Sequence, residues 1–437
     1  MAGIKKQFLC TNCGNITPKW QGKCPQCGEW NTLAEQMVKG GSASSLGGKA
    51  MIGKLQQLSE VSGRDLARFS SGMGEFDQVL GGGIVPGSLV LLGGDPGIGK
   101  STLALQLAGN IASSKDTDSV LYVSGEESAH QLKMRSSRLS AGSDIAVLTE
   151  TDLDVVMATI AAANPTVVII DSIQTLNSQS VNGVVGGVSQ LSFVTNSLMR
   201  LAKDQHVAII LIGHVTKEGM LAGPKTIEHM VDVVLYLEGD RFGNLRLLRS
   251  SKNRFGSVGE VGIFDMQEHG LVEVPNPAAM FLEHRDKPLP GSCVTATLEG
   301  NKVLLVEVQA LTNTTTLSYP RRVASGFDVN RLQLLLAIMQ KSLGINLSNQ
   351  DVFVNVAGGF KISERAADLP VVMAILSSFY GHPIPAGSIA FGEVGLLGEI
   401  RQVSNIEKRS KEAKKLGFTK LISSKDIRTL KDIKLKA

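Results

Sequence analysis

Five short apolar runs recur through the middle of the chain, each bounded by glycine, proline or polar residues. They cover residues 88–92, 119–123, 165–171, 207–212 and 231–236. Near-continuous apolar runs of this length are typical of strands that are buried on both faces, as in parallel sheets. Helical stretches such as 188–201 lie between them. The pattern therefore predicts a parallel sheet covered by helices on both faces, an α/β core.

The hydrophobic pattern changes after a group of prolines between residues 275 and 290. The runs 293–298 and 302–308 are joined by Glu299-Gly300-Asn301, which predicts a β-hairpin. Asp328 and Gly344 are placed to cap a helix between them. A helix over 331–343, a strand over 351–356 and a helix over 366–379 complete the expected elements. This part of the chain is predicted to be a separate α+β domain.

Composition places a further boundary near the N-terminus. Residues 39–48 are almost entirely glycine, serine and alanine, which is the composition of a flexible coil. The expected organisation is a cysteine module (1–35), a linker (36–57), the α/β domain (58–274), a second linker (275–290) and a C-terminal domain (291–437).

A glycine-rich segment follows the first apolar run and has the pattern G-x-x-x-x-G-K-S. Its residues are Gly94, Asp95, Pro96, Gly97, Ile98, Gly99, Lys100 and Ser101, and Thr102 continues into a helix-like stretch. Glycines let backbone N–H groups surround phosphate oxygens, and the helix N-terminus adds positive potential. Lys100 can reach the β- and γ-phosphates of ATP, and Ser101 can ligate Mg²⁺. The alternative, a chance glycine-rich turn, does not account for the strand before it, the lysine and the serine together.

Acidic residues end two of the other apolar runs. Asp171 ends the run 165–171, where a carboxylate holds the Mg²⁺ shell in P-loop ATPases. The next residue is Ser172, whereas AAA+ ATPases usually have their catalytic glutamate there. Glu126 and Glu127 follow the run 119–123, and we assign the general base to Glu126. Glu127 remains an alternative, as does a solvated glutamate pair that only opens a helix.

Four of the five cysteines form two C-x₂-C pairs, Cys10 with Cys13 and Cys24 with Cys27. Four thiolates at this spacing suit a tetrahedral Zn²⁺. Two disulfides are the alternative, and the expected cytoplasmic location disfavours them. That location is expected because no apolar run is long enough for a signal core or a membrane span. About 30 residues cannot bury a core unaided, so zinc would supply folding free energy in a small knuckle-like module.

Basic residues gather at two places outside the P-loop. Lys252 and Arg254 lie in the turn Lys252-Asn253-Arg254-Phe255-Gly256. They can project into a neighbouring subunit's nucleotide, contact DNA phosphate, or form an ordinary exposed turn. The tail 405–437 has eleven Lys/Arg against four Asp/Glu, which suits either an anionic partner or a solvated helix face.

Two glycine-containing segments, 177–190 and 216–225, follow strands on the nucleotide side of the predicted sheet. In RecA-like rings such loops face the central channel, where single-stranded DNA lies. Neither segment contains an aromatic residue, so base stacking is not evident in them. Both can equally be ordinary long connections.

These motifs together resemble the bacterial RadA (Sms) family of DNA-repair proteins. The resemblance is carried by the P-loop, Tyr122-Val-Ser-Gly-Glu-Glu-Ser128, the V-I-I-D-S-I-Q-T segment 168–175 and the K-N-R-F-G turn, and it covers essentially the whole chain. It implies a hexameric, RecA-like, DNA-stimulated ATPase that promotes branch migration in homologous recombination. Implied partners are single-stranded DNA, branched intermediates and a RecA-type recombinase, without a membrane. The catalytic residues would be Lys100, Glu126, Asp171, Lys252 and Arg254.

The resemblance also implies a C-terminal domain similar to the Lon peptidase. Lon chemistry needs a serine nucleophile and a lysine that takes its proton. The serine turn corresponds to Arg365-Ala366-Ala367-Asp368 and the lysine turn to Ser404-Asn405-Ile406-Glu407, and neither contains the required residue. We therefore expect a scaffold without peptidase activity. An ATP-dependent Lon-like protease and a KaiC-like regulatory ATPase remain the alternative functions.

Overall fold

The computed structural model describes residues 5–10, 15–38, 67–114, 119–139, 142, 144–213, 225–239, 244–274, 288–315, 317, 319–359 and 361–434. The chain divides into an N-terminal module and a larger unit that contains the remaining domains. Most of the predicted linker 36–57 and most of the linker 275–290 lie outside the described residues.

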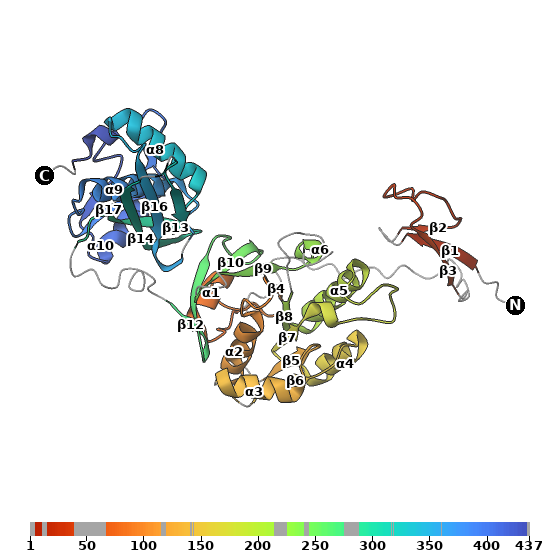
Figure 1. The fold of residues 1–437 in the computed structure, drawn as a ribbon. Helices are drawn as coiled ribbons and strands as arrows, with labels where there is room; N and C mark the ends of the chain where they lie inside the picture. Colours follow the sequence, from red (N-terminus) through yellow and green to blue (C-terminus); the bar gives the residue numbers. More distant parts are fainter. Residues whose placement is uncertain are drawn as a thin grey trace, which may run out of the picture. The chain divides into compact units, whose positions relative to one another are not determined.

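The N-terminal module is a small antiparallel sheet with the strand order β2-β1-β3 (Figure 1, red). Its strands are β1 (Lys5–Cys10), β2 (Ile16–Thr17) and β3 (Leu33–Val38). Cys10 pairs with Leu33 across β1 and β3, and Cys24 is buried beside both. The module is thus a three-stranded ribbon, larger than the knuckle predicted from the cysteine spacing, and β3 runs past the expected boundary at residue 35.

The central domain contains a nine-stranded sheet with the order β12-β11-β10-β9-β4-β8-β7-β5-β6 (Figure 1). The parallel strands are β4 (Leu89–Gly94), β5 (Val120–Ser124), β6 (Ala146–Leu148), β7 (Val167–Asp171), β8 (Ala208–Ile212) and β9 (Val233–Gly239). The antiparallel strands β10 (Leu245–Asn253), β11 (Val261–Gln267) and β12 (Gly270–Glu273) extend one edge.

All five predicted strands are present, and those expected from residues 165 and 231 each begin two residues later, at Val167 and Val233. Just before β9, the Asp232 carboxylate accepts a hydrogen bond from the Leu89 N–H at 3.1 Å, and the Asp232 N–H donates to the Leu89 carbonyl at 2.9 Å.

Side chains alternate between the two faces of the sheet and form two separate cores. One face packs against α1 (Gly74–Leu80), α2 (Lys100–Ala112) and α3 (Ala129–Leu139). The other packs against α4 (Leu153–Ala163), α5 (Val188–Gln205) and α6 (Lys225–Glu228). The predicted α/β core with helices on both faces is confirmed (Figure 1). A short 3₁₀ turn, η3 (Ile173–Thr175), follows β7.

The C-terminal domain is an α+β fold around a four-stranded sheet with the order β13-β14-β16-β15 (Figure 1, teal to blue). Its strands are β13 (Ser292–Glu299), β14 (Lys302–Thr314), β15 (Arg322–Ser325) and β16 (Gln350–Val356). Its helices are α8 (Val329–Leu343), α9 (Asp368–Tyr380) and α10 (Ile406–Lys415). Two small strand pairs complete it: β17 (Ser388–Ala390) with β20 (Lys420–Ile422), and β18 (Glu393–Val394) with β19 (Ile400–Arg401).

The predicted helix caps in this domain are confirmed. Asp328 accepts a hydrogen bond from the Arg331 N–H at 2.7 Å and begins α8, and Gly344 ends it with a φ of 68°. The helix expected from residue 366 begins as a 3₁₀ turn, η5 (Arg365–Ala367), and becomes α-helical at Asp368. The remaining 3₁₀ turns are η4 (Ala357–Gly359) and η6 (Leu430–Asp432). Within the described ranges, no helix is both long and apolar enough to cross a membrane.

Candidate functional site

The glycine-rich segment forms the loop between β4 and α2, at the carboxyl end of the parallel strands. Gly94 has a φ of 149°, and a Cβ there would lie 2.4 Å from the Leu237 carbonyl oxygen. Gly97 has a φ of 77° and open space beside it. No side chain caps the N-terminus of α2, which begins at Lys100. The loop therefore has the backbone freedom and the uncapped helix start that a phosphate cradle needs.

Lys100 lies at the centre of this loop and is buried. Its Nζ donates hydrogen bonds to the Gly94 carbonyl at 2.8 Å and the Asp95 carbonyl at 3.0 Å. Burial lowers the pKa of Lys100, whereas the negative charges of Asp171, Asp95 and Glu126 oppose that shift. The lysine and the two predicted catalytic carboxylates thus converge at one edge of the sheet. Ser101 and Thr102 follow it in the first turn of α2 and are half-buried.

Asp171 ends β7 next to Ser124, the last residue of β5. Its Oδ2 accepts a hydrogen bond from the Tyr122 hydroxyl at 2.7 Å. Burial and then the Asp171 charge raise the pKa of Tyr122 well above its usual value, so the phenol remains a donor. Tyr122 thereby orients the carboxylate that is predicted to hold Mg²⁺ with Ser101.

The two candidate bases differ in their partners. Glu126 Oε1 accepts a hydrogen bond from the Ser172 hydroxyl at 2.5 Å, which holds it beside the end of β7. Glu127 instead forms an ion pair with Arg135 of α3, at 2.6 Å. Glu126 is therefore the glutamate positioned next to Asp171, and this geometry supports its assignment over Glu127.

Sequence reasoning missed three residues that support this site. Tyr122 orients Asp171, and Ser172 holds Glu126, although Ser172 had been noted only as the residue that replaces an AAA+ glutamate. Arg246 of β10 is buried and donates from Nε to the Ile98 carbonyl of the P-loop at 3.0 Å. The available signal was a charged residue at an inward position of the alternating segment 245–249.

The P-loop lies at the carboxyl end of the parallel strands, whereas Lys252 and Arg254 lie at their amino end, which is the opposite edge of the sheet. Asn253, between them in sequence, pairs with Val233 at the start of β9, whereas Gly94 pairs with Leu237 near its end. Four residues of strand separate these positions, or about 13 Å along the sheet. Neither cation can therefore reach the nucleotide bound by its own P-loop.

Both cations of this turn have partners in the same chain. Lys252 Nζ donates to the Glu228 and His229 carbonyls at 2.9 and 3.0 Å, at the end of α6. Burial, and then repulsion from Arg254, lower the pKa of Lys252. Arg254 is half-exposed and pairs with Asp232 at 3.2 Å. Asn253 fixes the turn by donating to the Leu80 carbonyl at the end of α1, at 3.0 Å.

Of the two segments predicted to face DNA, the structure describes the first, 177–190, in full and only the last residue of the second, 216–225. Residues 177–187 are irregular and lead into α5, and Val184 and Val185 are exposed there by 78% and 59%. Residues 214–224, which contain most of the second segment, lie outside the described residues.

Three of the four predicted zinc ligands come together in the N-terminal ribbon. The Sγ atoms of Cys10, Cys24 and Cys27 lie within 4.8 Å of one another, and those of Cys10 and Cys27 are 3.6 Å apart. A tetrahedral site with Zn–S bonds of about 2.3 Å has sulfur–sulfur edges of about 3.8 Å. A hydrogen bond from the Cys27 backbone N–H is the main cause that lowers the pKa of Cys24. The thiolates fit zinc, and Cys13 lies outside the described residues.

In the C-terminal domain, buried ion pairs occupy the region where a Lon-like dyad would lie. Arg409 is fully buried, and its two Nη atoms donate to the Glu364 carboxylate at 2.8 and 2.6 Å. Asp368 is also buried and accepts from Arg331 Nε at 2.9 Å. Burial raises the pKa of Asp368, and Arg331 opposes that shift.

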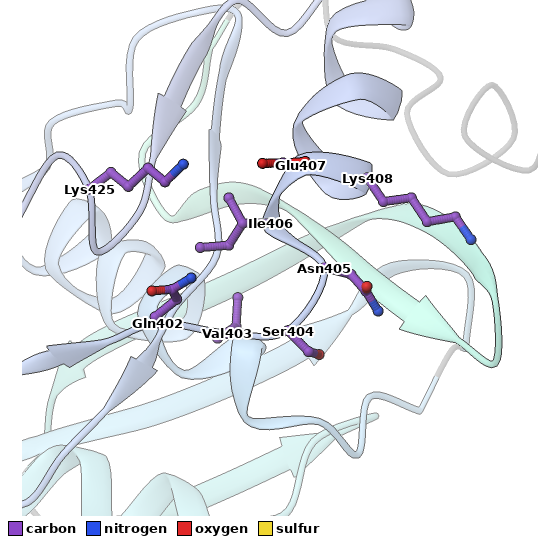
Figure 2. Close-up of a pocket in the computed structure, with 8 residues that line it drawn as sticks. All are labelled: Gln402, Val403, Ser404, Asn405, Ile406, Glu407, Lys408 and Lys425. Carbon is purple, nitrogen blue, oxygen red and sulfur yellow. The ribbon is translucent and has the colours of Figure 1, made fainter.

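A shallow pocket lies at the start of α10, over the turn that would carry a peptidase lysine (Figure 2). In this view Glu407 lies between Lys425 and Lys408. The Lys408 amine donates to the Asn301 carbonyl. The pocket is lined by Gln402, Val403, Ser404, Asn405, Ile406, Glu407, Lys408 and Lys425. Because this lining includes Ser404 with Lys408 and Lys425, the absence of peptidase activity stays a prediction.

Comparisons with known proteins match each part of the chain. The family described as an AAA domain matches residues 65–220, and the rubredoxin metal binding domain matches residues 8–35. The family described as subunit ChlI of Mg-chelatase matches residues 330–426. The RadB recombinase structure aligns with 47% of this chain and 99% of its own, at 25% identity and a TM-score of 0.37.

Full-length relatives extend across these domains. The DNA repair protein RadA of Bacillus subtilis (strain 168) is 48% identical over 427 residues, which cover 97% of this chain and 93% of that protein. The DNA repair protein RadA of Pseudomonas aeruginosa is 50% identical over 425 residues, with the same coverage. This chain therefore belongs to the DNA repair protein RadA family, with a RecA-like ATPase core, an N-terminal zinc ribbon and a C-terminal Lon-like domain.

Proposed function

We propose that this protein is a DNA-stimulated ATPase that promotes branch migration of recombination intermediates in the cytoplasm. It would work as a homo-hexameric ring on single-stranded DNA, alongside a RecA-type recombinase. The substrates would be ATP with Mg²⁺, and the ribbon would hold Zn²⁺. The observation that carries the proposal is the division of charged groups between the two edges of one sheet.

The P-loop edge contains what binding and hydrolysis require. Lys100 would exchange its two backbone carbonyl partners for phosphate oxygens, which are better acceptors because they are charged. Ser101 and Asp171 would hold Mg²⁺, with Tyr122 fixing the carboxylate. Glu126, held by Ser172, would orient the attacking water and accept its proton.

The position of Arg254 at the opposite edge of the sheet is the reason to propose a ring. Arg254 is half-exposed, and its turn lies about 13 Å along the sheet from its own P-loop. If it stabilises charge on a γ-phosphate, that phosphate must belong to a neighbouring subunit. An arginine in this role contributes roughly 10³–10⁵ to the rate.

Lys252 links this turn to the segment proposed to face DNA. Its amine holds the end of α6, which directly follows residues 214–224. DNA bound at that segment would therefore act on the turn that carries Arg254. This connection gives a physical route from DNA binding to hydrolysis.

The test is ATP hydrolysis measured with and without single-stranded DNA, on the wild type and on Arg254→Ala. The variant should bind ATP normally but lose the stimulation by DNA. Arg200→Ala is a matched control, because Arg200 is an exposed arginine on α5. A wild-type rate that does not respond to DNA would contradict the proposal.

Mixing two inactive variants tests action between subunits. A Lys100→Ala subunit still offers Arg254, and an Arg254→Ala subunit still offers an intact P-loop. Mixed rings should therefore recover part of the activity that each variant lacks alone. Absence of recovery in rings shown to be mixed would argue against action in trans, or indicate that several adjacent intact sites are needed.

A further inference from the structure

The sequence contains only two tryptophans, Trp20 and Trp30, and both lie in the zinc ribbon. Their side chains are exposed by 56% and 68%. Tryptophan is a large apolar ring that buries readily, and paired exposed rings therefore indicate a contact surface. Neither ring contributes to the small core of the ribbon, which contains Cys10, Cys24 and Leu33.

The two rings are held next to each other by the loop that carries the metal ligands. A Cβ on Gly22 would lie 3.5 Å from the Trp30 ring and 3.9 Å from the Trp20 ring, so both rings border this glycine. The Asn31 N–H donates to the Gly22 carbonyl at 2.8 Å, and Lys23 pairs with Trp30 in an isolated antiparallel bridge. We call Trp20 and Trp30 the tryptophan pair.

Positive charge accompanies the pair. Lys19 is exposed directly before Trp20, and Lys23 Nζ lies over one face of the Trp30 ring, 5.7 Å from its centre, which leaves the other face for a base. Flat aromatic faces beside flexible cations match a partner that has stacked π-faces and a negative backbone. Single-stranded nucleic acid has both, and base–aromatic stacking contributes to its binding with little dependence on sequence.

We propose that the tryptophan pair is a base-stacking platform for single-stranded DNA. The inference rests on the proposed DNA-stimulated function and adds a second contact to it. The segment 177–190 has no aromatic residue with which to stack a base. The ribbon would supply that interaction from outside the ATPase core, with Lys19 and Lys23 contacting phosphates.

The chain offers a direct readout, because it contains no other tryptophan. Titration of the full-length protein with oligothymidylate should quench its tryptophan fluorescence, with saturation at the DNA concentration that saturates the ATPase. Trp20→Ala/Trp30→Ala should weaken oligothymidylate binding about 10- to 100-fold, as expected for one or two lost base stacks. Binding is followed by the anisotropy of a labelled oligonucleotide.

Three controls separate stacking from general damage. Trp20→Phe/Trp30→Phe retains two aromatic faces and should keep most of the affinity. Tyr319→Ala removes an aromatic side chain that is 87% exposed in the C-terminal domain and should change nothing. Zinc content, measured by elemental analysis, should be the same in all variants.

The outcomes distinguish this inference from the proposed function. If DNA stimulates ATP hydrolysis but the double-alanine variant binds it like the wild type and fluorescence is unchanged, the platform is wrong and the ATPase proposal stands. If fluorescence is quenched without stimulation, the platform stands and the DNA-stimulated function is wrong. If neither occurs, both are wrong, and the tryptophan pair serves another partner, such as a protein.

Discussion

Two regions of the molecule bring buried charges together. We call the end of the central sheet that carries Lys100 the ATPase edge, and the region around Arg409 and Asp368 in the C-terminal domain the Lon-like turn. The two regions satisfy their charges differently. At the Lon-like turn, Arg409 pairs with Glu364 and Arg331 pairs with Asp368, each through two nitrogen atoms. At the ATPase edge, Lys100 donates to neutral carbonyls while carboxylates lie nearby.

This difference indicates which charges work on a substrate. Oppositely charged groups that form ion pairs already satisfy each other's hydrogen-bonding capacity, and separating them costs free energy. A buried lysine that donates to neutral carbonyls gains stronger hydrogen bonds when a charged phosphate replaces them. The first arrangement holds a domain together, whereas the second is prepared for a ligand.

The largest effect is expected at Lys100. Lys100→Ala removes the cation that contacts the phosphates and should reduce ATP hydrolysis to the background level. Lys203→Ala, on the exposed end of α5, is the control and should hydrolyse ATP normally. Steady-state phosphate release measures both. Substantial hydrolysis by Lys100→Ala would mean that the convergence at this edge is not the active centre.

The next largest effect separates the two adjacent glutamates. Glu126→Gln should lower kcat by about 10²–10⁴, the range for removal of a general base, while ATP binding persists. Glu127→Gln should have little effect on kcat, because Glu127 pairs with Arg135 of α3 instead. Single-turnover hydrolysis and nucleotide binding are the measurements. The reverse ranking would assign the base to Glu127.

The sequence predicted the parts of this comparison that depend on local pattern. The P-loop, the five strands and the capped helix α8 follow from spacing and short-range chemistry. The side-chain pairs in both regions could not be predicted, because they join distant residues: Tyr122 with Asp171, Ser172 with Glu126, and Arg409 with Glu364. Only the packing of strands and helices brings such partners together.

The dependence on distant contacts also explains why some strands and the size of the ribbon were not predicted. The segment 245–249, with its charged Arg246 and Arg249, was predicted as a strand and lies in β10, whereas β11 and β12 were not predicted. Arg246 is nevertheless buried against the P-loop carbonyl of Ile98. The ribbon exceeds the predicted knuckle because β1 pairs with β3 across the whole segment 11–32, which contains the other three cysteines of the two C-x₂-C pairs.

A third prediction tests whether the Lon-like pairs are structural. Arg409→Met leaves Glu364 without its partner and should reduce the free energy of unfolding by about 3 kcal/mol, the lower end for a broken buried pair, since Glu364 is partly exposed. ATP hydrolysis per folded molecule should be unchanged. Urea denaturation followed by circular dichroism gives the free energy.

The matched control for this pair is Arg409→Met/Glu364→Leu. Removal of both charges should recover most of the lost stability, because no unpaired buried charge remains. If the single variant is as stable as the wild type, or if it alone abolishes ATP hydrolysis, the division between structural and catalytic charges is wrong.

The smallest effect is expected at Ser172, which touches the base and not the substrate. Ser172→Ala removes the hydroxyl that donates to Glu126 at 2.5 Å and should lower kcat roughly tenfold with little change in KM, because a misplaced base is still present. Ser128→Ala, beside the same glutamates but bonded to Gln131, is the control and should behave like the wild type. A double-mutant cycle gives the decisive measurement: when Glu126→Gln is already present, Ser172→Ala should cause no further loss, since Ser172 acts only through that carboxylate. Additive losses would show that Ser172 contributes by another route, and the geometry at the end of β7 would then have to be assigned to nucleotide binding instead of base positioning.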